Sequence, residues 1–284
     1  GRAATTLPFI GRAAEMAMIA TAGSGRLALI EGEAGVGKTR LASEVVAQHV
    51  AQGGLALASA ARELEQGLPY QPWIGLLRDL LAHPDWGTLR VSLNLAPVWF
   101  GEVARLLPEL LPGSAPPTQA DEARLWEGVA RLLIALAQQK PLMIGLDDLH
   151  WADASSLALL GYVLRRTGDV PLRVVATARA ADHPAPLRTL LTTLIREGRL
   201  ERILIRRLSI AETESLARAL SPHDAARLAA WLYRTTEGNP FMMTELVRHA
   251  RTVGLLAVDG RLSATLPDEP VVPSSVYSLI QERL

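Results

Sequence analysis

The sequence predicts an α/β protein built on a parallel sheet with helices on both faces. Short apolar segments of strand length alternate with longer segments of helical periodicity, as in consecutive β–α–β units. The short segments are apolar throughout rather than at every second residue, which is typical of strands buried on both faces. A glycine-rich turn follows the first of them directly, and a helical pattern follows that turn.

Five segments are predicted to form the strands, at 27–31, 55–60, 142–146, 172–177 and 202–205. The helix after the first strand runs from Lys38 to about Gln52, where two glycines end it. A long helical stretch, about 71–139, separates the second strand from the third. We predict that its four tryptophans form the core of a helical insertion rather than a stacking surface for bases; they are Trp73, Trp86, Trp99 and Trp126.

Strand patterns stop near Leu208, and three helical patterns follow at 210–220, 222–236 and 240–253. We therefore predict an αβ domain over residues 1–208 that contains the insertion at 71–139, and a small helical domain over 209–254. A third unit is expected to begin within 255–284. The helical pattern at 274–284 reaches the last residue without a stop signal, so we expect the native protein to be longer.

Composition excludes several classes of protein. The 29 Lys and Arg residues balance the 29 Asp and Glu residues, which argues against a strongly basic surface for nucleic acid. The absence of cysteine excludes a disulfide scaffold, thiol catalysis and cysteine-ligated metals. No secretory signal is visible, and no apolar stretch reaches the roughly 18 residues of a membrane span. We therefore expect a cytoplasmic protein that does not enter membranes.

The segment after the first strand matches the phosphate-loop pattern G-x-x-x-x-G-K-[ST]. Glycines allow consecutive backbone N–H groups to point at phosphate oxygens, and the helix that follows adds its positive end. The lysine of this pattern bridges the terminal phosphates, and the threonine hydroxyl ligates Mg²⁺. We predict nucleotide contacts from Gly32, Ala34, Gly35, Val36, Gly37, Lys38, Thr39 and Arg40, with Thr39 also a metal ligand.

Lysine is scarce, because 27 of the 29 basic residues are arginine. Biased genomic composition explains the scarcity itself. One of the two lysines, Lys38, nevertheless stands where a compact ammonium must fit between phosphates, a place that the planar fork of arginine fits poorly. The other, Lys140, is predicted to be a solvated loop residue.

Two acids follow the apolar strand at 142–146. We expect this strand to lie beside the phosphate-loop strand, so that Asp147 holds the Mg²⁺ shell and Asp148 polarises the attacking water. Such acids alone usually mark a solvated strand end, but the phosphate loop upstream favours the metal role. The next strand ends in Thr177 and Arg179, which we expect to sense the γ-phosphate. An arginine that binds helix carbonyls or a surface carboxylate is the alternative.

Together these residues resemble the STAND class of AAA+-related signalling ATPases (NOD/NACHT-like). More narrowly, they are similar to the ATPase module of bacterial large ATP-binding LuxR-type regulators and related multidomain signalling proteins. The resemblance covers nearly the whole chain. Two sequence strings, Asp148–Trp151 and Gly238–Pro240, are the most specific to this class. The full set of strings that carry the resemblance is Phe9–Arg12, Gly32–Ala42, Leu68–Trp73, Leu146–Asp153, Thr177–Arg179 and Thr236–Phe241.

The resemblance implies a P-loop NTPase fold, then a helical lid domain, then a winged helix that 255–284 would open. It also implies that Arg179 is a sensor arginine and that Pro240 closes over the base. The adenine would be flanked by Phe9, Ile10, Gly11 and Arg12. Ala13 departs from the family pattern because an acid is expected there, and Glu15 is out of register. A buried structural role and a catalytic role both stay open for His150 and Trp151.

The function implied is an Mg²⁺-dependent, slow ATPase that acts as a switch, with ATP and ADP favouring different packings of the lid. Sensor and DNA-binding domains would lie outside this chain, and nucleotide-dependent self-association is expected. We do not expect this part of the protein to bind DNA itself. Two alternatives stay open: a latent module that holds ADP without turnover, and a motor stimulated by nucleic acid. A small-molecule kinase would need an arginine-rich lid over the phosphates and is disfavoured, since the lid candidate carries Pro240 and apolar residues.

Overall fold

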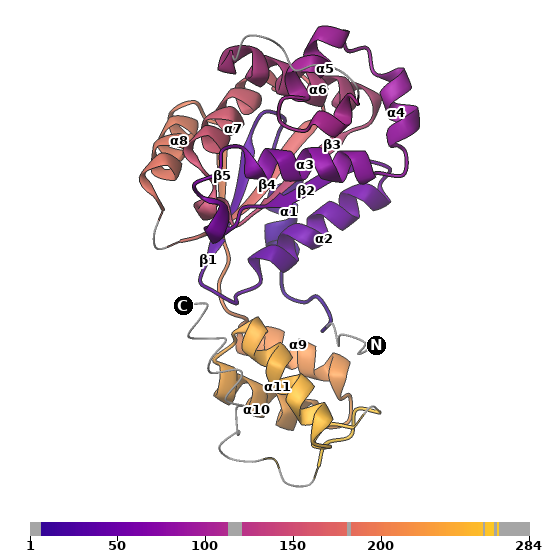
Figure 1. Cartoon of the computed structure of the whole chain (residues 1–284). Coiled ribbons are helices and arrows are strands. Elements are labelled where there is room, and N and C mark those ends of the chain that lie inside the picture. The colour runs from indigo at the N-terminus through magenta and orange to yellow at the C-terminus, as the bar shows by residue number, and fades with distance from the viewer. Residues whose placement is uncertain (1–6, 113–120, 181–182, 258, 264–265, 267–284) are drawn as a thin grey trace. The chain divides into compact units, whose positions relative to one another are not determined.

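The computed structural model describes residues 7–112, 121–180, 183–257, 259–263 and 266 (Figure 1). Its centre is a five-stranded sheet in the order β2-β3-β4-β1-β5. The ladders of β1 with β5, β2 with β3 and β3 with β4 are parallel. The predicted α/β class with a parallel sheet is confirmed, and the strands are β1 (Leu27–Gly32), β2 (Leu55–Ala60), β3 (Leu142–Asp147), β4 (Leu172–Arg179) and β5 (Leu200–Leu204).

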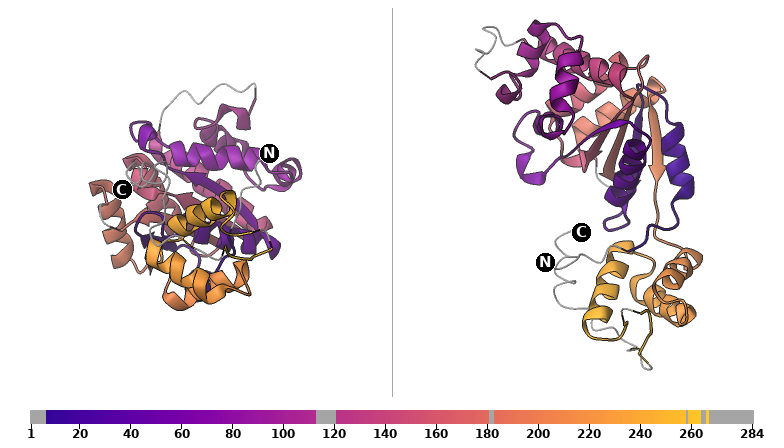
Figure 2. Two further views of the ribbon diagram at one scale, coloured as in Figure 1. Left: turned by 90° about the horizontal axis from the view of Figure 1, so that it is seen from below. Right: turned by 90° about the vertical axis from the view of Figure 1, so that its right-hand side faces the viewer.

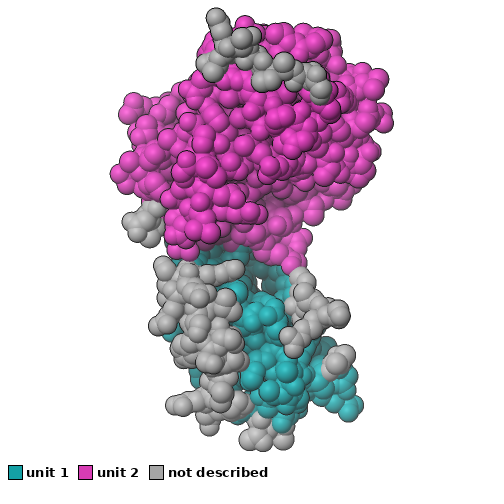
Figure 3. All heavy atoms as spheres, in the orientation of Figure 1, with its two compact units in different colours: residues 1–15, 32–37, 205–284 teal, residues 16–31, 38–204 magenta. Residues whose placement is uncertain are grey.

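The chain forms two compact units, coloured separately in Figure 3. Unit 1 consists of 1–15, 32–37 and 205–284, and unit 2 of 16–31 and 38–204. The glycine-rich turn of the phosphate loop thus groups with the C-terminal helices, while Lys38 and Thr39 group with the sheet. The domain boundaries that the sequence suggested, 1–208 and 209–254, stay a prediction.

Helices cover both faces of the sheet in unit 2 (Figure 2). On one face, α2 (Lys38–Ala51) packs against β2, β3 and β4. The other face is covered by α3 (Gln71–Ala82), α6 (Glu122–Gln139) and α7 (Ala154–Arg166). The remaining elements of this part of the chain are α1 (Ala13–Thr21), α4 (Trp86–Ser92), α5 (Pro97–Val103), α8 (Ala185–Arg196) and the short 3₁₀ helices η1 (Glu63–Glu65), η2 (Pro108–Leu110) and η3 (Leu149–Trp151).

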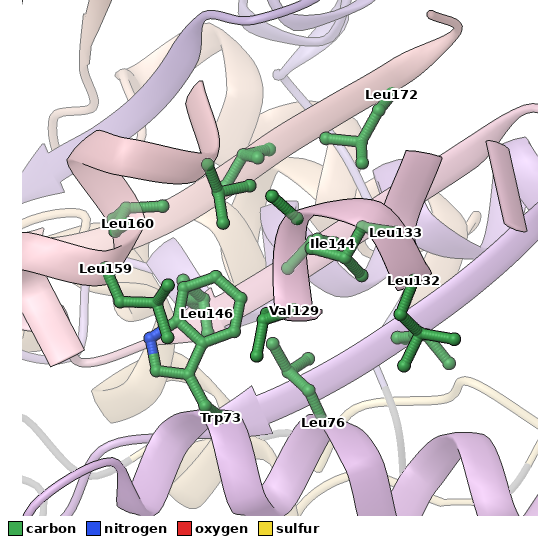
Figure 4. Close-up of a cluster of buried hydrophobic side chains, with 14 of the residues drawn as sticks. Trp73, Leu76, Val129, Leu132, Leu133, Ile144, Leu146, Leu159, Leu160 and Leu172 are labelled. Atoms are coloured by element: carbon green, nitrogen blue, oxygen red, sulfur yellow. The ribbon is translucent and has the colours of Figure 1, made fainter. Parts of the chain in front are cut away.

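Alternate residues of β3 show why this strand is apolar throughout. Leu142, Ile144 and Leu146 face the large core formed with α3, α6 and α7 (Figure 4). Gly145 points the other way, where an added Cβ would lie 3.5 Å from a methyl group of Val46 in α2. A strand with a packed layer on each side has no position for polar side chains until it ends.

The tryptophans of the helical insertion do contribute to the core, although unequally. Trp73 is buried, and its indole N–H donates to the carbonyl of Ser156 at 3.0 Å (Figure 4). Trp86 is also buried, and Trp126 packs against the same cluster. Trp99 is half-buried, with the guanidinium of Arg131 at 4.6 Å from its ring centroid. A stacked arginine and a satisfied indole are features of a protein core and its edge.

Three helices form the core of unit 1: α9 (Ile210–Leu220), α10 (Ala225–Thr236) and α11 (Pro240–Thr252). Ser209 begins α9 with a capping box, because its hydroxyl accepts from the Glu212 N–H while the Glu212 carboxylate accepts from the Ser209 N–H. Most of the predicted winged-helix start, 255–284, lies outside the described residues. Within the described parts of the chain, none of the helices combines the length and apolarity needed to cross a bilayer.

A buried carboxylate stands at the end of β1, immediately before the glycine-rich turn. Glu31 is 1% exposed, and Arg202 of β5 binds it through two hydrogen bonds, Nε at 2.6 Å and Nη2 at 3.0 Å. The Nε2 atom of His183 lies 3.1 Å from the same carboxylate. The hydrogen bonds to Glu31 raise the pKa of the Arg202 guanidinium. This pairing therefore supports the strand from which the turn departs.

We predict that Arg202→Met lowers the free energy of unfolding by about 2 kcal/mol, because it leaves a buried charge with a weaker partner. The loss is smaller than the roughly 3–5 kcal/mol of a fully buried pair since the Arg202 side chain is half-exposed. Urea unfolding at neutral pH measures it. The control is Lys140→Met, which removes an exposed ion pair with Asp85 at 2.9 Å and should lower stability clearly less, because solvent screens exposed pairs. Equal losses in the two variants would contradict this account of Glu31.

Candidate nucleotide-binding site

The glycine-rich turn needs glycine for both conformation and space. Gly35 and Gly37 have φ angles of +73° and +101°, a region that other residues rarely adopt. A Cβ on Gly35 would lie 3.0 Å from the Oδ1 atom of Asn239, so the site is also close-packed. Gly37 has open space at its Cβ position. The turn therefore has the backbone geometry on which a nest of N–H groups depends.

The start of α11 is hydrogen-bonded to this turn within unit 1. The Oδ1 atom of Asn239 caps the helix by accepting from the N–H groups of Phe241 and Met242 at 3.0 and 3.3 Å. Its Nδ2 atom donates to the carbonyl of Ala34 at 3.3 Å, and the Phe241 N–H donates to the carbonyl of Gly35 at 3.1 Å. Pro240, the first residue of α11, is half-buried beside these contacts. Its predicted closure over the base stays a prediction.

Arg12 ties the N-terminal segment to the same turn. Its guanidinium is buried and donates to the carbonyls of Arg206 at 2.5 Å and Val36 at 3.4 Å. The Oε1 atom of Glu15 lies 3.1 Å from the Nη1 atom of Arg12. The acid that is out of register with the family pattern therefore forms an ion pair with this arginine. Ala13 is exposed at the start of α1. The protein contacts of Arg12 make it a structural anchor in addition to its predicted place beside the adenine.

The other residues of the N-terminal string lie against the helices of unit 1. Ile10 packs on a small cluster that contains Leu208 and Met243. Gly11 has a φ of +76°, and an added Cβ there would collide with Glu212. Phe9 is half-buried. The structure thus brings this string to the helical part of the chain, while an adenine contact from Phe9, Ile10 or Gly11 stays a prediction.

In unit 2, a carboxylate and two hydroxyls meet where α2 begins and β3 and β4 end. The Thr39 hydroxyl lies 2.9 and 3.0 Å from the two carboxylate oxygens of Asp147. The Thr177 hydroxyl donates to Asp147 at 2.5 Å and accepts from the Asp148 backbone N–H at 2.9 Å. Lys38 is buried at the first position of α2, and Arg40 is exposed and paired with Glu44. Three elements therefore deliver their polar residues to one place.

One expectation about the strands requires correction. The strand that carries Asp147 does not lie beside the phosphate-loop strand, since β4 lies between β3 and β1. Chain order could not reveal this, because β4 enters the sheet after β3 and occupies the interior position. Thr177 is fully buried, and its hydroxyl binds the two neighbouring acids. The signal for that role was present in the sequence as a polar residue inside an apolar strand.

The donor atoms around Asp147 suit Mg²⁺. This ion prefers hard oxygen ligands and usually takes one or two from the protein, with waters and substrate phosphates completing its octahedron. A hydroxyl from Thr39 beside a carboxylate from Asp147 is such a pair. The described residues contain no group of three or more acidic or histidine side chains that could hold a metal alone. The set therefore fits an ion that arrives with phosphate.

Asp148 and His150 follow Asp147 in a tight turn. Asp148 adopts a left-handed conformation with φ of 52°, and η3 begins directly after it. Burial lowers the pKa of His150 to about 4, helped by the positive charges of Arg179 and Lys38. Arg179 ends β4 with a partly exposed side chain. The cations predicted to bind phosphate thus gather near this histidine in unit 2.

A hydrogen bond joins two of the strings that carry the resemblance, Leu68–Trp73 and Leu146–Asp153. The Tyr70 N–H donates to the Asp153 carboxylate at 3.1 Å, and the same carboxylate caps α7 through the Ser156 N–H at 2.8 Å. Tyr70 has a φ of 65°, so Asp153 stabilises a backbone conformation that is unusual for tyrosine. The segment after β3 is therefore braced against the start of α3.

A parallel sheet with a phosphate-loop motif, an acid at the end of β3 and a lysine at the start of α2 defines a nucleotide-binding ATPase module of the AAA+ type. The model of the AAA ATPase domain family matches residues 8–175 of this chain. The chain belongs to that family. The predicted resemblance to AAA+-related ATPases is therefore confirmed. A separate comparison with curated protein sequences gave no match.

Two solved structures have similar folds. One is a signal transduction ATPase with numerous domains (STAND) and a tetratricopeptide repeat sensor from Pyrococcus horikoshii, at 18% identity and a TM-score of 0.57. The match covers 98% of this chain but 33% of that chain, so this chain spans about a third of its length. The other is the ORC2 protein of Aeropyrum pernix, in ADPNP–ADP complexes, at 14% identity and a TM-score of 0.53 over 91% of this chain and 67% of that one. These identities show likeness of fold alone.

We predict that acidification destabilises the nucleotide-free protein through His150. A histidine whose pKa falls from 6.5 to about 4 on folding binds more protons in the unfolded state between these values, so stability is lost as pH falls through that window. From pH 7 to pH 5 the loss from this residue is about 2 kcal/mol. Urea unfolding at both pH values should show a loss smaller by this amount in His150→Phe. The control is the exposed His223, changed to Asn; an equal pH slope in wild type and His150→Phe would refute the prediction.

Proposed function

We propose that this chain is an ATP-binding, slowly hydrolysing, Mg²⁺-dependent switch module of a multidomain regulator. The observation that carries the proposal is the Thr39–Asp147–Thr177 network, which joins the last residue of the phosphate-loop motif to the ends of β3 and β4. Hydroxyl and carboxylate oxygens in this arrangement are the ligands that an Mg²⁺–nucleotide complex requires. Membership of the AAA ATPase domain family supports the reaction class.

Each residue of the proposed site has a role that its position supports. The backbone from Gly32 to Gly37 would bind the phosphates, and Lys38 would bridge the terminal ones. Thr39 and Asp147 would hold Mg²⁺, which neutralises charge on the phosphates. Asp148 would polarise the attacking water, and Arg179 would stabilise charge that develops in transfer.

The switching part of the proposal depends on contacts inside unit 1. The start of α11 binds the carbonyls of Ala34 and Gly35 directly. Phosphate binding at the opposite, N–H side of this turn would therefore change the free energy of a backbone that α11 also contacts. A ligand shifts a conformational equilibrium only through such differential contacts. ATP and ADP differ by the γ-phosphate, so they would favour different states of the lid.

The output of the module is proposed from resemblance. Transcriptional regulators of the LuxR type combine such a module with sensor and DNA-binding domains, and we propose the same arrangement here, with nucleotide-dependent self-association. The similar STAND protein of Pyrococcus horikoshii carries a tetratricopeptide repeat sensor, which supports a sensor domain as the partner of this fold. The balanced charge of the chain supports a proposal in which another domain, rather than this one, binds DNA.

We predict that Lys38→Ala weakens ATP–Mg²⁺ binding by about 10- to 100-fold, which corresponds to a lost charge-assisted hydrogen bond of roughly 1.5–3 kcal/mol. Nucleotide released from denatured protein is identified first, and affinity is then measured by calorimetry. Lys140→Ala is the matched control, because it changes the only other lysine and its exposed partner is Asp85. Failure of wild type to bind at millimolar ATP–Mg²⁺ would overturn the proposed function.

We predict that Asp148→Asn retains ATP–Mg²⁺ affinity and lowers turnover by about 10²- to 10⁴-fold, the usual contribution of a group that activates water. Asp147→Asn should instead raise the Mg²⁺ concentration needed for half-maximal turnover. Phosphate release under single-turnover conditions measures both. Wild-type protein that binds ADP and never hydrolyses ATP would support the latent module, and turnover that requires DNA would support a motor.

A further inference from the structure

His150 is a buried polar side chain that the protein leaves unsatisfied. The residue is 4% exposed, and neither ring nitrogen has a hydrogen-bond partner among the residues that the structure describes. Its ring packs against that of Trp151, with centroids 4.8 Å apart. A buried donor or acceptor without a partner costs free energy, so each such group requires an explanation. Packing alone would be served better by an apolar residue.

The carboxylate of Asp148 is close to this imidazole but not bonded to it. The Nδ1 atom of His150 lies 3.9 Å from the Oδ1 atom of Asp148, about 1 Å beyond a normal hydrogen bond. The Asp148 backbone is fixed, because its N–H donates to Thr177 at 2.9 Å. Its side chain is 42% exposed. Rotation about the side-chain torsions of Asp148 can therefore close the gap without a change in the strands.

The charges around His150 determine which hydrogen bond it can make. Arg179 and Lys38 face it with positive charge, and Asp147 faces it with negative charge. Burial lowers the pKa of His150 to about 4, and the charges of Arg179 and Lys38 add to this effect, so the ring is neutral at physiological pH. A neutral imidazole carries one N–H, and donation to a carboxylate requires that this proton sit on Nδ1.

We propose that His150 is a positioning residue that orients Asp148 for hydrolysis by donating its Nδ1–H to the Asp148 carboxylate when ATP–Mg²⁺ is bound. This inference rests on the proposed ATPase function. The water oxygen forms the new bond to the γ-phosphorus, the bond from that phosphorus to the β–γ bridging oxygen breaks, and one water proton passes to the phosphate products or to solvent. His150 keeps its own proton throughout. It holds one oxygen of Asp148 so that the other faces the water.

The side chain of Asp148 gives a reason for such support. An aspartate is one methylene shorter than a glutamate, and the left-handed backbone of Asp148 further restricts where its carboxylate can point. A displacement of about 1 Å at a reacting group can cost up to 10²-fold in rate. A rigid donor behind the carboxylate would limit that loss.

Three substitutions at His150 separate positioning from packing. In His150→Asn the amide nitrogen can take the place of Nδ1, whereas in His150→Gln it falls nearer the place of Nε2. His150→Phe keeps a ring against Trp151 and has no donor. We expect kcat to fall by about 10- to 100-fold in the Phe and Gln variants and to recover substantially in the Asn variant. The KM for ATP–Mg²⁺ should change less than about twofold in all three.

A purely structural histidine would give the opposite order. The Phe variant would then retain the most activity, and the loss of kcat would follow the loss of stability measured by urea unfolding. A double-mutant cycle adds a second test, because in the Asp148→Asn background His150→Phe should have no further effect on kcat. Additive effects, or equal activity of the Asn and Gln variants, would overturn the inference.

Two readouts distinguish failure of this inference from failure of the ATPase function. Turnover by wild type that does not exceed that of Lys38→Ala would refute the function itself. Measurable wild-type turnover that His150→Phe leaves unchanged would refute the inference alone. Independently of activity, ¹⁵N NMR of the imidazole with a non-hydrolysable ATP analogue and Mg²⁺ should show the Nδ1–H tautomer. Asp148→Asn should alter that signal, and an Nε2–H tautomer in the wild type would also overturn the inference.

Discussion

The carboxylate of Asp147 holds together the polar groups of the candidate site in unit 2. It accepts from Thr39 at the start of α2 and from Thr177 at the end of β4, while it belongs to β3 itself. Because helices pack on both faces of this sheet, most residues between the strand ends meet apolar neighbours, and the polar groups of the candidate site lie where the strands end. The same burial that makes the strands apolar therefore concentrates hydroxyls, carboxylates and cations at one edge of the sheet.

A second constraint acts on the glycine-rich turn in unit 1. Its carbonyl groups are bound by Asn239 and Arg12, and by the N–H of Phe241. Binding of the carbonyls orients these peptides, so that their N–H groups point to the opposite side of the turn before any ligand arrives. Pre-orientation of this kind lowers the entropy lost on binding. One set of protein contacts thus serves both the geometry of the turn and its coupling to α11.

Local patterns predicted the strands, the phosphate loop and the three C-terminal helices, because strand length, glycine spacing and caps are written in neighbouring residues. The order of strands was beyond such patterns, as the interior place of β4 between β3 and β1 shows. The pairing of Glu31 with Arg202 and His183 was also beyond them, since it joins residues more than 150 positions apart. Thr177 is an intermediate case. The sequence shows a polar residue within an apolar strand, but its hydrogen-bond partners depend on the order of the strands in the sheet.

The histidine after the paired acids has structural features that favour one of the two roles that the sequence leaves open. The ring nitrogens of a structural histidine in a core normally form hydrogen bonds with backbone or side-chain groups, because a buried nitrogen without a hydrogen bond costs free energy. Within the described residues His150 has no such partners, and its Nδ1 atom lies 3.9 Å from the carboxylate of Asp148, whose backbone N–H is held by Thr177. If the proposed hydrogen bond forms when nucleotide binds, the cost of the unsatisfied ring in the free state would favour the arrangement of Asp148 in which that bond is made.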